Sequence, residues 1–530
     1  MSVQTKPDIV WIVLDTLRAD RLSCYGYPRE TSPYLDAFAE GGVTFERAIS
    51  PAQWTIPAHA SFFTGEYPTT HATVQIYDKQ SKTQVTLADL LRQAGYLTVG
   101  FCNNPLLGVV ENGLDRGFEE FYNYGGTLPE RPAVADARPR RLGRLTQRLV
   151  RPLRRMIAPI QDAFARSDLL LRIALHPRIV PLWQRHINFK GNTVQSLRDV
   201  VGYLRARRQK GAERPLFAFI NLMETHLPFG PRPQFIRKFA SLYREDREAR
   251  DFMQEYNREH YRWMVPLTEP LTELQDQVIN DMYDAEVAYE DHLMRRVYEH
   301  LDEPDVRDNT LVIVTSDHGE GMNNHSFVGH SLVAYDDLVR VPLIARYPRL
   351  YPEERRVTTP VSARRIFHSA LEAAGILSTN NGAGETEGAP VDVEGLSLTS
   401  TFNGSNPEAD AVFTEAYTPH TLIALMENSD PEAIETFRCR SMRRAVYRDN
   451  YKLITVGDEP DELFDVVADP GELDNLIDEN PGLATELNQL LTDFRTETEA
   501  RRPTQWEDAQ LHLADDEMLL ERLRGLGYID

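Results

Sequence analysis

The chain has 530 residues, of which 42% are hydrophobic and 26% are charged, so it is long enough for one large core with a smaller domain beside it. Its net charge of −22 disfavours nucleic acid as a partner, because phosphate groups would be repelled. Three scattered cysteines, Cys24, Cys102 and Cys439, are too few for a disulfide framework or a thiolate metal site.

The positive charge comes almost entirely from arginine, because lysines are few. An acidic surface poor in lysine is typical of halophilic proteins, although a merely acidic protein fits the composition equally well. The N-terminus shows no signal peptide, and no segment approaches the roughly 20 apolar residues that a membrane-spanning helix needs. We therefore expect a cytoplasmic protein.

Continuous apolar runs predict the strands of a sheet that is covered on both faces. The first run covers residues 9–14 and is followed at once by Asp15. Further strands are predicted over 44–49, 97–101, 215–221, 310–315, 341–345 and 411–413, and helices over 33–40, 86–94, about 192–208 and 271–300. Strands that alternate with helices indicate an α/β fold with a mostly parallel sheet.

The stretch 54–65 follows a loop and predicts the start of a buried helix. Thr55 is a favourable N-cap residue, and Pro57 in the first turn costs little because early helix N–H groups have no intrahelical partner. A hydroxyl there suits a group that attacks, and then carries, an anionic phosphoryl or sulfuryl unit. An ordinary capped helix has the same pattern, so this stretch alone does not establish a nucleophile.

The segment 137–192 is rich in arginine and interleaves apolar residues, whereas its only acids are Asp162 and Asp168. Such a basic amphipathic segment suggests contact with an anionic partner or peripheral contact with a membrane surface. The alternative is an inserted helical lid whose arginines pair with the protein's own acids, and we favour this second interpretation.

The pattern changes after a loop rich in Gly, Glu and Asn at 380–394. Residues 444–454 predict a hairpin that turns at Asp449 and Asn450, and a short strand at 462–465 and a helix at 481–495 follow. We therefore expect a main domain over 1–435, which includes the basic insertion, and a small C-terminal α+β subdomain with a helical tail over 436–530.

Polar residues follow two of the predicted core strands. Asp15 follows the first, and Asp317 and His318 follow the strand at 310–315, so the three side chains should meet at one edge of the sheet. Carboxylate and imidazole ligands suit a divalent cation, here Mn, Zn, Mg or Ca. Thr55 would complete the site as its alkoxide, because a bound metal lowers the pKa of a hydroxyl.

Several short motifs occur together in this chain, and their combination resembles that of the sulfatase family within the alkaline phosphatase superfamily. They are residues 7–16, 23–27 and 31–36, the stretch 55–65, His226–Phe229, Ser316–Gly319, Tyr335 with 340–344, and 462–465 with 469–472. The resemblance covers nearly the whole chain outside the basic insertion and the C-terminal tail. It implies an alkaline-phosphatase-like α/β/α sandwich and a metal-dependent enzyme that cleaves phosphate or sulfate esters.

The departures from the family pattern matter as much as the matches. Thr55 stands where sulfatases have the Cys or Ser that is oxidised to formylglycine, and threonine offers no route to that aldehyde. His59 replaces the motif arginine, Thr16 replaces a second metal-binding acid, Asn103 and Asn104 occupy the region of a Gly-Lys-x-His-x-Gly element, and Asp317-His318 replaces an Asp-Asn pair. This variant looks more like the phosphotransferase and phosphodiesterase branches, such as the lipoteichoic acid synthase and lipid A phosphoethanolamine transferase enzymes.

The resulting hypothesis is a hydrolase or transferase that forms a covalent intermediate on Thr55, with phosphoesters or phosphodiesters favoured. His226 or His330 would protonate the leaving oxygen and later activate water, and His59, Asn103 and His325 are assigned to substrate binding. The substrate would be an anionic ester of a glycan, a lipid head group or a small molecule. The alternatives are a sulfatase acting on a glycan or lipid, and an inactive member that binds anionic glycans or lipids.

Overall fold

The computed structural model describes residues 6–125, 131–132, 190–258, 263–264, 266–267, 269–376, 393–403 and 411–502. The basic segment predicted at 137–192 lies outside the described residues apart from its last three positions. Its role as a lid or as a membrane contact therefore stays a prediction.

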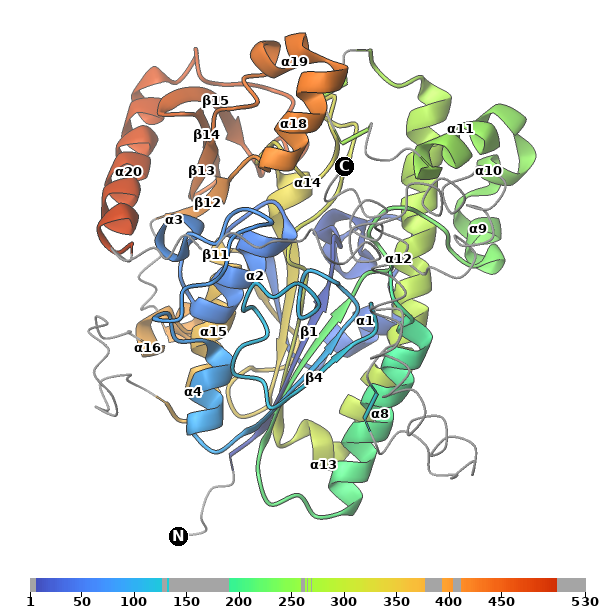
Figure 1. The fold of residues 1–530 in the computed structure, drawn as a ribbon, viewed down its shortest axis with the longest axis vertical. Coiled ribbons are helices and arrows are strands. Elements are labelled where there is room, and N and C mark those ends of the chain that lie inside the picture. Colours follow the sequence, from blue (N-terminus) through green and yellow to red (C-terminus); the bar gives the residue numbers. More distant parts are fainter. Residues whose placement is uncertain are drawn as a thin grey trace, which may run out of the picture.

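A nine-stranded sheet runs through the centre of the molecule (Figure 1), in the order β10-β2-β9-β6-β1-β5-β3-β4, with β11 paired to β2. Its strands are β1 (Asp8–Leu14), β2 (Val43–Ile49), β3 (Leu97–Cys102), β4 (Glu120–Asn123), β5 (Leu216–Leu222), β6 (Thr310–Thr315), β9 (Arg340–Arg346), β10 (Arg355–Val357) and β11 (Val361–Ser362). Neighbours are parallel except β9, which is antiparallel to both β2 and β6. The predicted α/β class with a mostly parallel sheet is confirmed.

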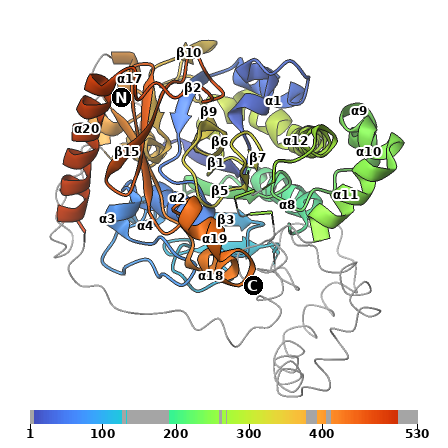
Figure 2. The same ribbon diagram turned by 90° about the horizontal axis from the view of Figure 1, so that it is seen from above.

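Helices cover both faces of this sheet (Figure 2), because the side chains of the core strands are apolar on both sides. Val10, Ile12 and Leu14 of β1 pack into the core beneath the first helical layer, whereas Ile9, Trp11 and Val13 pack into the opposite core. The first layer contains α1 (Pro33–Ala39), α8 (Thr193–Gln209) and α12 (Glu273–Leu301), and the second contains α2 (Thr55–Thr64), α4 (Leu87–Gln93) and α15 (Ile366–Ala373).

A second, antiparallel sheet follows in the order β12-β13-β14-β15. It comprises β12 (Val412–Ala416), β13 (Arg443–Arg448), β14 (Tyr451–Val456) and β15 (Glu459–Asp465), and α20 (Pro481–Ala500) packs on it. The predicted hairpin at Asp449 and Asn450 joins β13 to β14.

The strand predicted at 411–413 as part of the main sheet is a wrong assignment, because β12 pairs with β13 instead. A short apolar run fits either sheet, and only the tertiary partner decides between them. The second sheet thus contains strands from both sides of the predicted boundary between 435 and 436. The division into two domains stays a prediction.

A buried ion cluster joins the second sheet to the main one. The ammonium group of Lys452, on β14, lies 2.9 Å from Asp336 Oδ1 and 2.6 Å from Glu472 Oε1. Asp336 begins α14 (Asp336–Val339), which leads directly into β9. The side chain of Lys452 is fully buried, so this cluster fixes the second sheet against the end of a core strand.

In the ranges that the structure describes, no helix has the combination of length and apolar character that crossing a bilayer requires.

Trp11 fixes α2 on the sheet and offers a test of the packing. Its ring centroid lies 5.4 Å from that of Phe62, 6.1 Å from Phe63 and 5.9 Å from Phe219. We predict that Trp11→Ala lowers the free energy of unfolding by about 3–5 kcal/mol, measured by chemical denaturation, because it leaves a large cavity. The control Val467→Ala, at a side chain that is 55% exposed, should change it by less than about 0.5 kcal/mol. Equal effects of the two variants would contradict the packing described.

Candidate active site

The carboxyl ends of β1, β3, β5 and β6 meet at one edge of the sheet, because these four strands are mutually parallel. Asp15 follows β1 directly, Asp317 and His318 follow β6, and His226 lies in the loop after β5. Ligands of open α/β sheets bind at this edge. The predicted meeting of Asp15, Asp317 and His318 at one edge of the sheet agrees with the structure, which adds His226 to the same edge.

Thr55 is the first helical residue of α2, and its N-cap is Trp54, which has an extended backbone. The predicted N-cap role of Thr55 is thus wrong by one position, and no side chain caps this helix. The Thr55 hydroxyl oxygen instead lies 3.3 Å from Nε2 of His318. The hydroxyl is buried at the positive end of a helix and points to the residues that follow β6.

Asp15, Asp317 and His318 converge on one point. Each offers a ligand atom, and the three atoms lie within 4.8 Å of one another. His318 Nε2 is 3.4 Å from Asp317 Oδ2 and 4.0 Å from Asp15 Oδ1. Two ligands at about 2.0–2.1 Å from a tetrahedral ion lie roughly 3.3–3.4 Å apart, which matches the shorter of these distances and the distance from His318 to Thr55.

The chemistry of the donor atoms also fits a cation. Asp15 Oδ1 and Asp317 Oδ2 are buried and have no hydrogen-bond partner among the described residues, a costly state that a bound ion would relieve. His318 Nδ1 donates a hydrogen bond to the carbonyl oxygen of Gly319 at 2.9 Å. Its Nε2 therefore carries the lone pair that a metal requires. The site fits one divalent ion.

The remaining carboxylate oxygens are held in place. Asn104 Nδ2 donates to Asp15 Oδ2 at 2.8 Å. The backbone N–H groups of Thr16 and His318 donate to Asp317 Oδ1 at 3.3 and 3.0 Å. Each carboxylate thus keeps one oxygen in a fixed position and presents the other to the ion.

Burial is the main cause of the pKa shifts of these groups. Burial, together with the nearby Asp317 carboxylate, raises the pKa of Asp15 well above its usual range. Burial raises the pKa of Asp317 to about 7 and lowers the pKa of His318 to about 4. Two buried carboxylates beside a neutral imidazole lack a positive charge, which a divalent cation would supply.

Three imidazole rings lie close together at the site, one pair edge to face and the other tilted. The ring centroid of His330 lies 4.6 Å from that of His318 and 4.9 Å from that of His226. His226 Nδ1 donates to the carbonyl oxygen of Leu227 at 2.6 Å, and His330 Nδ1 lies 2.9 Å from Glu320 Oε1. Burial lowers the pKa of His330 to about 3, and burial with the nearby His330 lowers the pKa of His226 well below its usual range.

The three residues assigned to substrate binding, His59, Asn103 and His325, lie in different parts of the structure. His59 lies one turn after Thr55, and its Nδ1 is 2.9 Å from the carbonyl oxygen of Thr55 and 3.5 Å from Asp317 Oδ2. Asn103 donates to Thr193 at 2.7 Å, and it is its neighbour Asn104 that contacts Asp15. His325 stacks on Tyr335 with centroids 3.6 Å apart and lines a separate pocket, away from the residues that surround Thr55.

Sequence reasoning missed the residues that support the histidines. Glu320 faces His330, and Lys190 donates to Glu286 Oε1 at 2.8 Å and to the carbonyl oxygen of Glu224 at 2.6 Å, which holds the loop that carries His226. The proximity of Glu320 to His318 in the chain was a usable signal. Nothing in the sequence links Lys190 to Glu286, which lies on the distant helix α12.

Comparison with known proteins agrees with this geometry. The family model Sulfatase matches residues 7–376. An uncharacterized sulfatase, YidJ, from Escherichia coli is 25% identical over 477 residues, covering 89% of this chain and 84% of its own. An ulvan-active sulfatase from Formosa agariphila is 25% identical over 493 residues, covering 92% and 80%.

Among solved structures, a phosphonate monoester hydrolase of Agrobacterium radiobacter superimposes with a TM-score of 0.61 at 21% identity, covering 93% of this chain and 96% of its own. A structure in complex with D-glucosamine-2-N,6-O-disulfate superimposes with a TM-score of 0.60 at 17% identity, covering 95% and 100%. These likenesses show the predicted alkaline-phosphatase-like fold. Because the family model spans the chain from β1 to α15, the protein belongs to the sulfatase family and is an enzyme that acts on sulfuric or phosphoric esters.

Proposed function

We propose that this enzyme cleaves phosphate esters, and phosphodiesters above all, through a covalent intermediate on Thr55. One observation carries the proposal. The hydroxyl of Thr55 is buried at the start of α2, 3.3 Å from His318 Nε2, beside two carboxylate oxygens that have no hydrogen-bond partner among the described residues.

Asp15, Asp317, His318 and the Thr55 oxygen would hold one divalent ion. When bound, the ion supplies the charge that lowers the pKa of the hydroxyl and stabilises negative charge on the ester oxygens. The imidazole nitrogen among these ligands favours Zn over Mg, Ca and Mn, which suit oxygen ligands better.

The reaction would proceed in two displacements. The Thr55 oxygen, having lost its proton to solvent, attacks the phosphorus in line with the leaving group, and the bond from phosphorus to the leaving oxygen breaks. A histidine gives the proton on one ring nitrogen to that oxygen and takes another from a neighbouring carboxyl group. The N–H groups of the first turn of α2 and the dipole of this helix favour the phosphoryl group on Thr55. Attack by water then breaks the bond from phosphorus to the Thr55 oxygen and releases a phosphate monoester from a diester substrate, or phosphate from a monoester. An acceptor alcohol in a transferase would release a new ester in the same way, and the proton of the attacking hydroxyl goes to the histidine or to Thr55.

His330 is better placed than His226 to act as the acid. Burial raises the pKa of Glu320 to about 8, so its carboxyl group can hold a proton in the 2.9 Å contact with His330 Nδ1 and pass it on as the other ring nitrogen of His330 gives up its own. The partner of His226 is a carbonyl group at 2.6 Å, which has no proton to give. His226 then serves as the neighbour that positions water or substrate.

The charge of the site favours a singly charged substrate. Two carboxylates already match the charge of a divalent ion, and no lysine or arginine in the described ranges pairs with Asp15, Asp317 or His318. A dianionic phosphate monoester would meet no surplus positive charge, whereas a phosphodiester carries a single negative charge. A sulfate ester also carries a single charge, so sulfatase activity is the second candidate.

Substrate comparison tests this charge argument. We predict that, with Mn or Zn added at pH 8, kcat/KM for bis(4-nitrophenyl) phosphate exceeds that for 4-nitrophenyl phosphate by at least about tenfold, a difference of about 1.4 kcal/mol in the barrier. The monoester is doubly charged at this pH because its second pKa is about 6. Faster turnover of 4-nitrophenyl sulfate than of the diester would establish the sulfatase alternative, and a preference for the monoester would refute the charge argument.

The nucleophile is tested by trapping the adduct. We predict that acid quenching during turnover of the diester gives a peptide with an aryl phosphoryl group on Thr55. Thr55→Ala should lower kcat at least about 1,000-fold because the covalent route is lost, whereas Thr55→Ser should still form an adduct. Thr64→Ala, at the other end of the same helix, is the matched control and should change kcat less than about threefold. Wild-type turnover by Thr55→Ala would disprove the assignment.

The identity of the acid is tested with leaving groups of different basicity. We predict that His330→Ala lowers kcat for methyl phenyl phosphate about 100-fold more than for methyl 4-nitrophenyl phosphate, because the more basic phenolate needs a proton. His226→Ala should lower both rates by similar factors. The reverse pattern would make His226 the acid, and equal losses in both variants would mean that neither histidine protonates the leaving group.

A further inference from the structure

The residue that follows Asp15 has an unusual backbone. Thr16 has a φ of 62°, in the left-handed region that β-branched residues rarely adopt, because there the Cβ atom approaches the backbone too closely. It lies in a turn that is closed by a hydrogen bond from the N–H of Leu17 to the carbonyl oxygen of Leu14 at 3.2 Å. A turn with a positive φ at its third residue usually has glycine there. A threonine at this position therefore needs contacts that hold it.

The side chain of Thr16 does not supply these contacts. It is fully buried, and its Oγ1 has no hydrogen-bond partner among the described residues. The peptide group before Thr16 is instead held at both ends. Its carbonyl oxygen, which belongs to Asp15, accepts from Thr225 Oγ1 at 2.7 Å, and its N–H donates to Asp317 Oδ1 at 3.3 Å. The conformation of Thr16 thus joins the backbone beside one carboxylate to the other carboxylate.

The peptide group after Thr16 is held by Tyr283, from the long helix α12. The Tyr283 hydroxyl donates to the carbonyl oxygen of Thr16 at 2.7 Å and accepts from the N–H of Arg18 at 2.9 Å. Tyr283 is fully buried, so water would not readily replace these two bonds. We propose that Tyr283 is a positioning residue of the ion site. Its hydroxyl holds Thr16 in the left-handed conformation, and this conformation sets Asp15 against Asp317.

The ring of Tyr283 is itself fixed. It packs in the core beneath the first helical layer, and its centroid lies 5.8 Å from that of Phe229. The helix that carries it runs along the central sheet (Figure 1) and has 29 residues. A side chain that is locked by packing on a rigid helix positions a loop more precisely than a side chain on another loop does.

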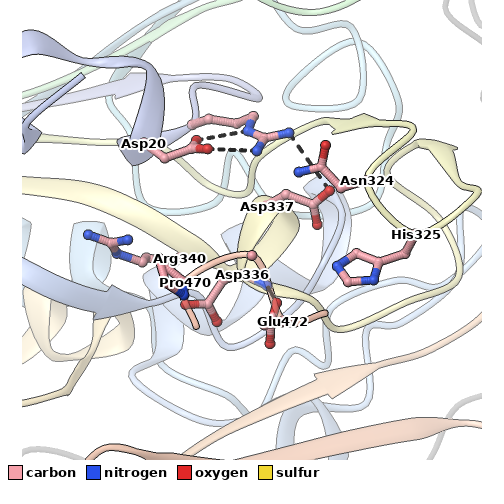
Figure 3. A pocket seen from close by; sticks show the side chains of 10 residues that line it. Asp20, Asn324, His325, Asp336, Asp337, Arg340, Pro470 and Glu472 are labelled. Atoms are coloured by element: carbon pink, nitrogen blue, oxygen red, sulfur yellow. Dashed lines mark hydrogen bonds and ion pairs between the residues drawn. The ribbon is translucent and has the colours of Figure 1, made fainter. Parts of the chain in front are cut away.

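The chain on the other side of the turn is also held. The N–H of Leu17 donates to Ser316 Oγ at 2.9 Å. The side chain of Arg18 reaches the pocket that His325 lines, where the dashed lines in Figure 3 mark its contacts with Asp20 and Asp337. Because its neighbours are fixed, the turn cannot relieve the strain at Thr16 by shifting as a whole. The orientation of the Thr16 carbonyl group then depends on the Tyr283 hydroxyl.

Zinc titration of the full chain tests this role, which depends on the ion site that we propose above. Apoprotein would be titrated with zinc chloride in a calorimeter, and the transition that Asp317→Ala abolishes reports the ion site. We predict that Tyr283→Phe, which keeps the ring, raises the Kd of this transition about tenfold, at the low end of the range for groups that orient metal ligands.

Tyr298→Phe is the matched control for the loss of a hydroxyl. Tyr298 also lies on α12, and its buried hydroxyl has no hydrogen-bond partner among the described residues. This variant should change the Kd for zinc less than about threefold, because no contact with the turn is lost.

Glycine at position 16 gives a second test. Glycine adopts a positive φ without strain, so the hydroxyl should matter less there. When Thr16→Gly is already present, adding Tyr283→Phe should raise the Kd less than about threefold. If Tyr283 served only the stability of the fold, its replacement would lower the resistance to urea and leave the Kd for zinc unchanged.

The possible failures can be told apart. The role of Tyr283 is overturned, and the ion site is left intact, if Tyr283→Phe binds zinc as tightly as the wild type or if Tyr298→Phe loses as much affinity. It is also overturned if Tyr283→Phe has equal effects with threonine and with glycine at position 16. If the wild type binds no zinc at a site that requires Asp317, the ion site fails, and the proposed function fails with it.

Discussion

The burial of two neighbouring carboxyl groups, Asp15 after β1 and Asp317 after β6, is the constraint on which the candidate site depends. Asp15 and Asp317 are fully buried, and this burial raises the pKa of both carboxyl groups, with the nearby Asp317 adding to the shift of Asp15. A folded chain retains such a pair only where a cation, or protons, can offset it. Thr55, at the start of α2, and the imidazole of His318 lie in the same small region. The burial of the two carboxyl groups therefore lowers stability at the place where a reaction would occur.

The central sheet brings these groups together. Parallel strands bring residues that are distant in sequence to one edge, and the apolar side chains on both faces of β1 leave the strand no freedom to shift its register. Asp15 and Asp317 therefore hold their positions because Trp11 and its neighbours are packed. The geometry of the candidate site is in this sense a product of the core.

Much of this arrangement could be predicted from the sequence, and the reason is physical. A strand buried on both faces is a continuous apolar run, so β1, β5 and β6 were evident, and Asp15, Asp317 and His318 followed from where those strands end. The start of α2 was misplaced because it depends on the extended backbone of Trp54. The separate pocket of His325, the contact of Asn104 with Asp15 and the pairing of β12 depend on tertiary contacts that no local pattern encodes.

The buried cluster around Lys452 has a consequence for anyone who shortens this chain. A fragment that ends before β14 would remove the ammonium group and leave Asp336 buried without its counter-charge, at the entrance to the core strand β9. Losing one member of such a cluster typically costs about 3–5 kcal/mol, a large part of the stability of most domains. The second sheet is thus held to the main one by this cluster. A design that grafts or exchanges the second sheet must keep Lys452, Asp336 and Glu472 together.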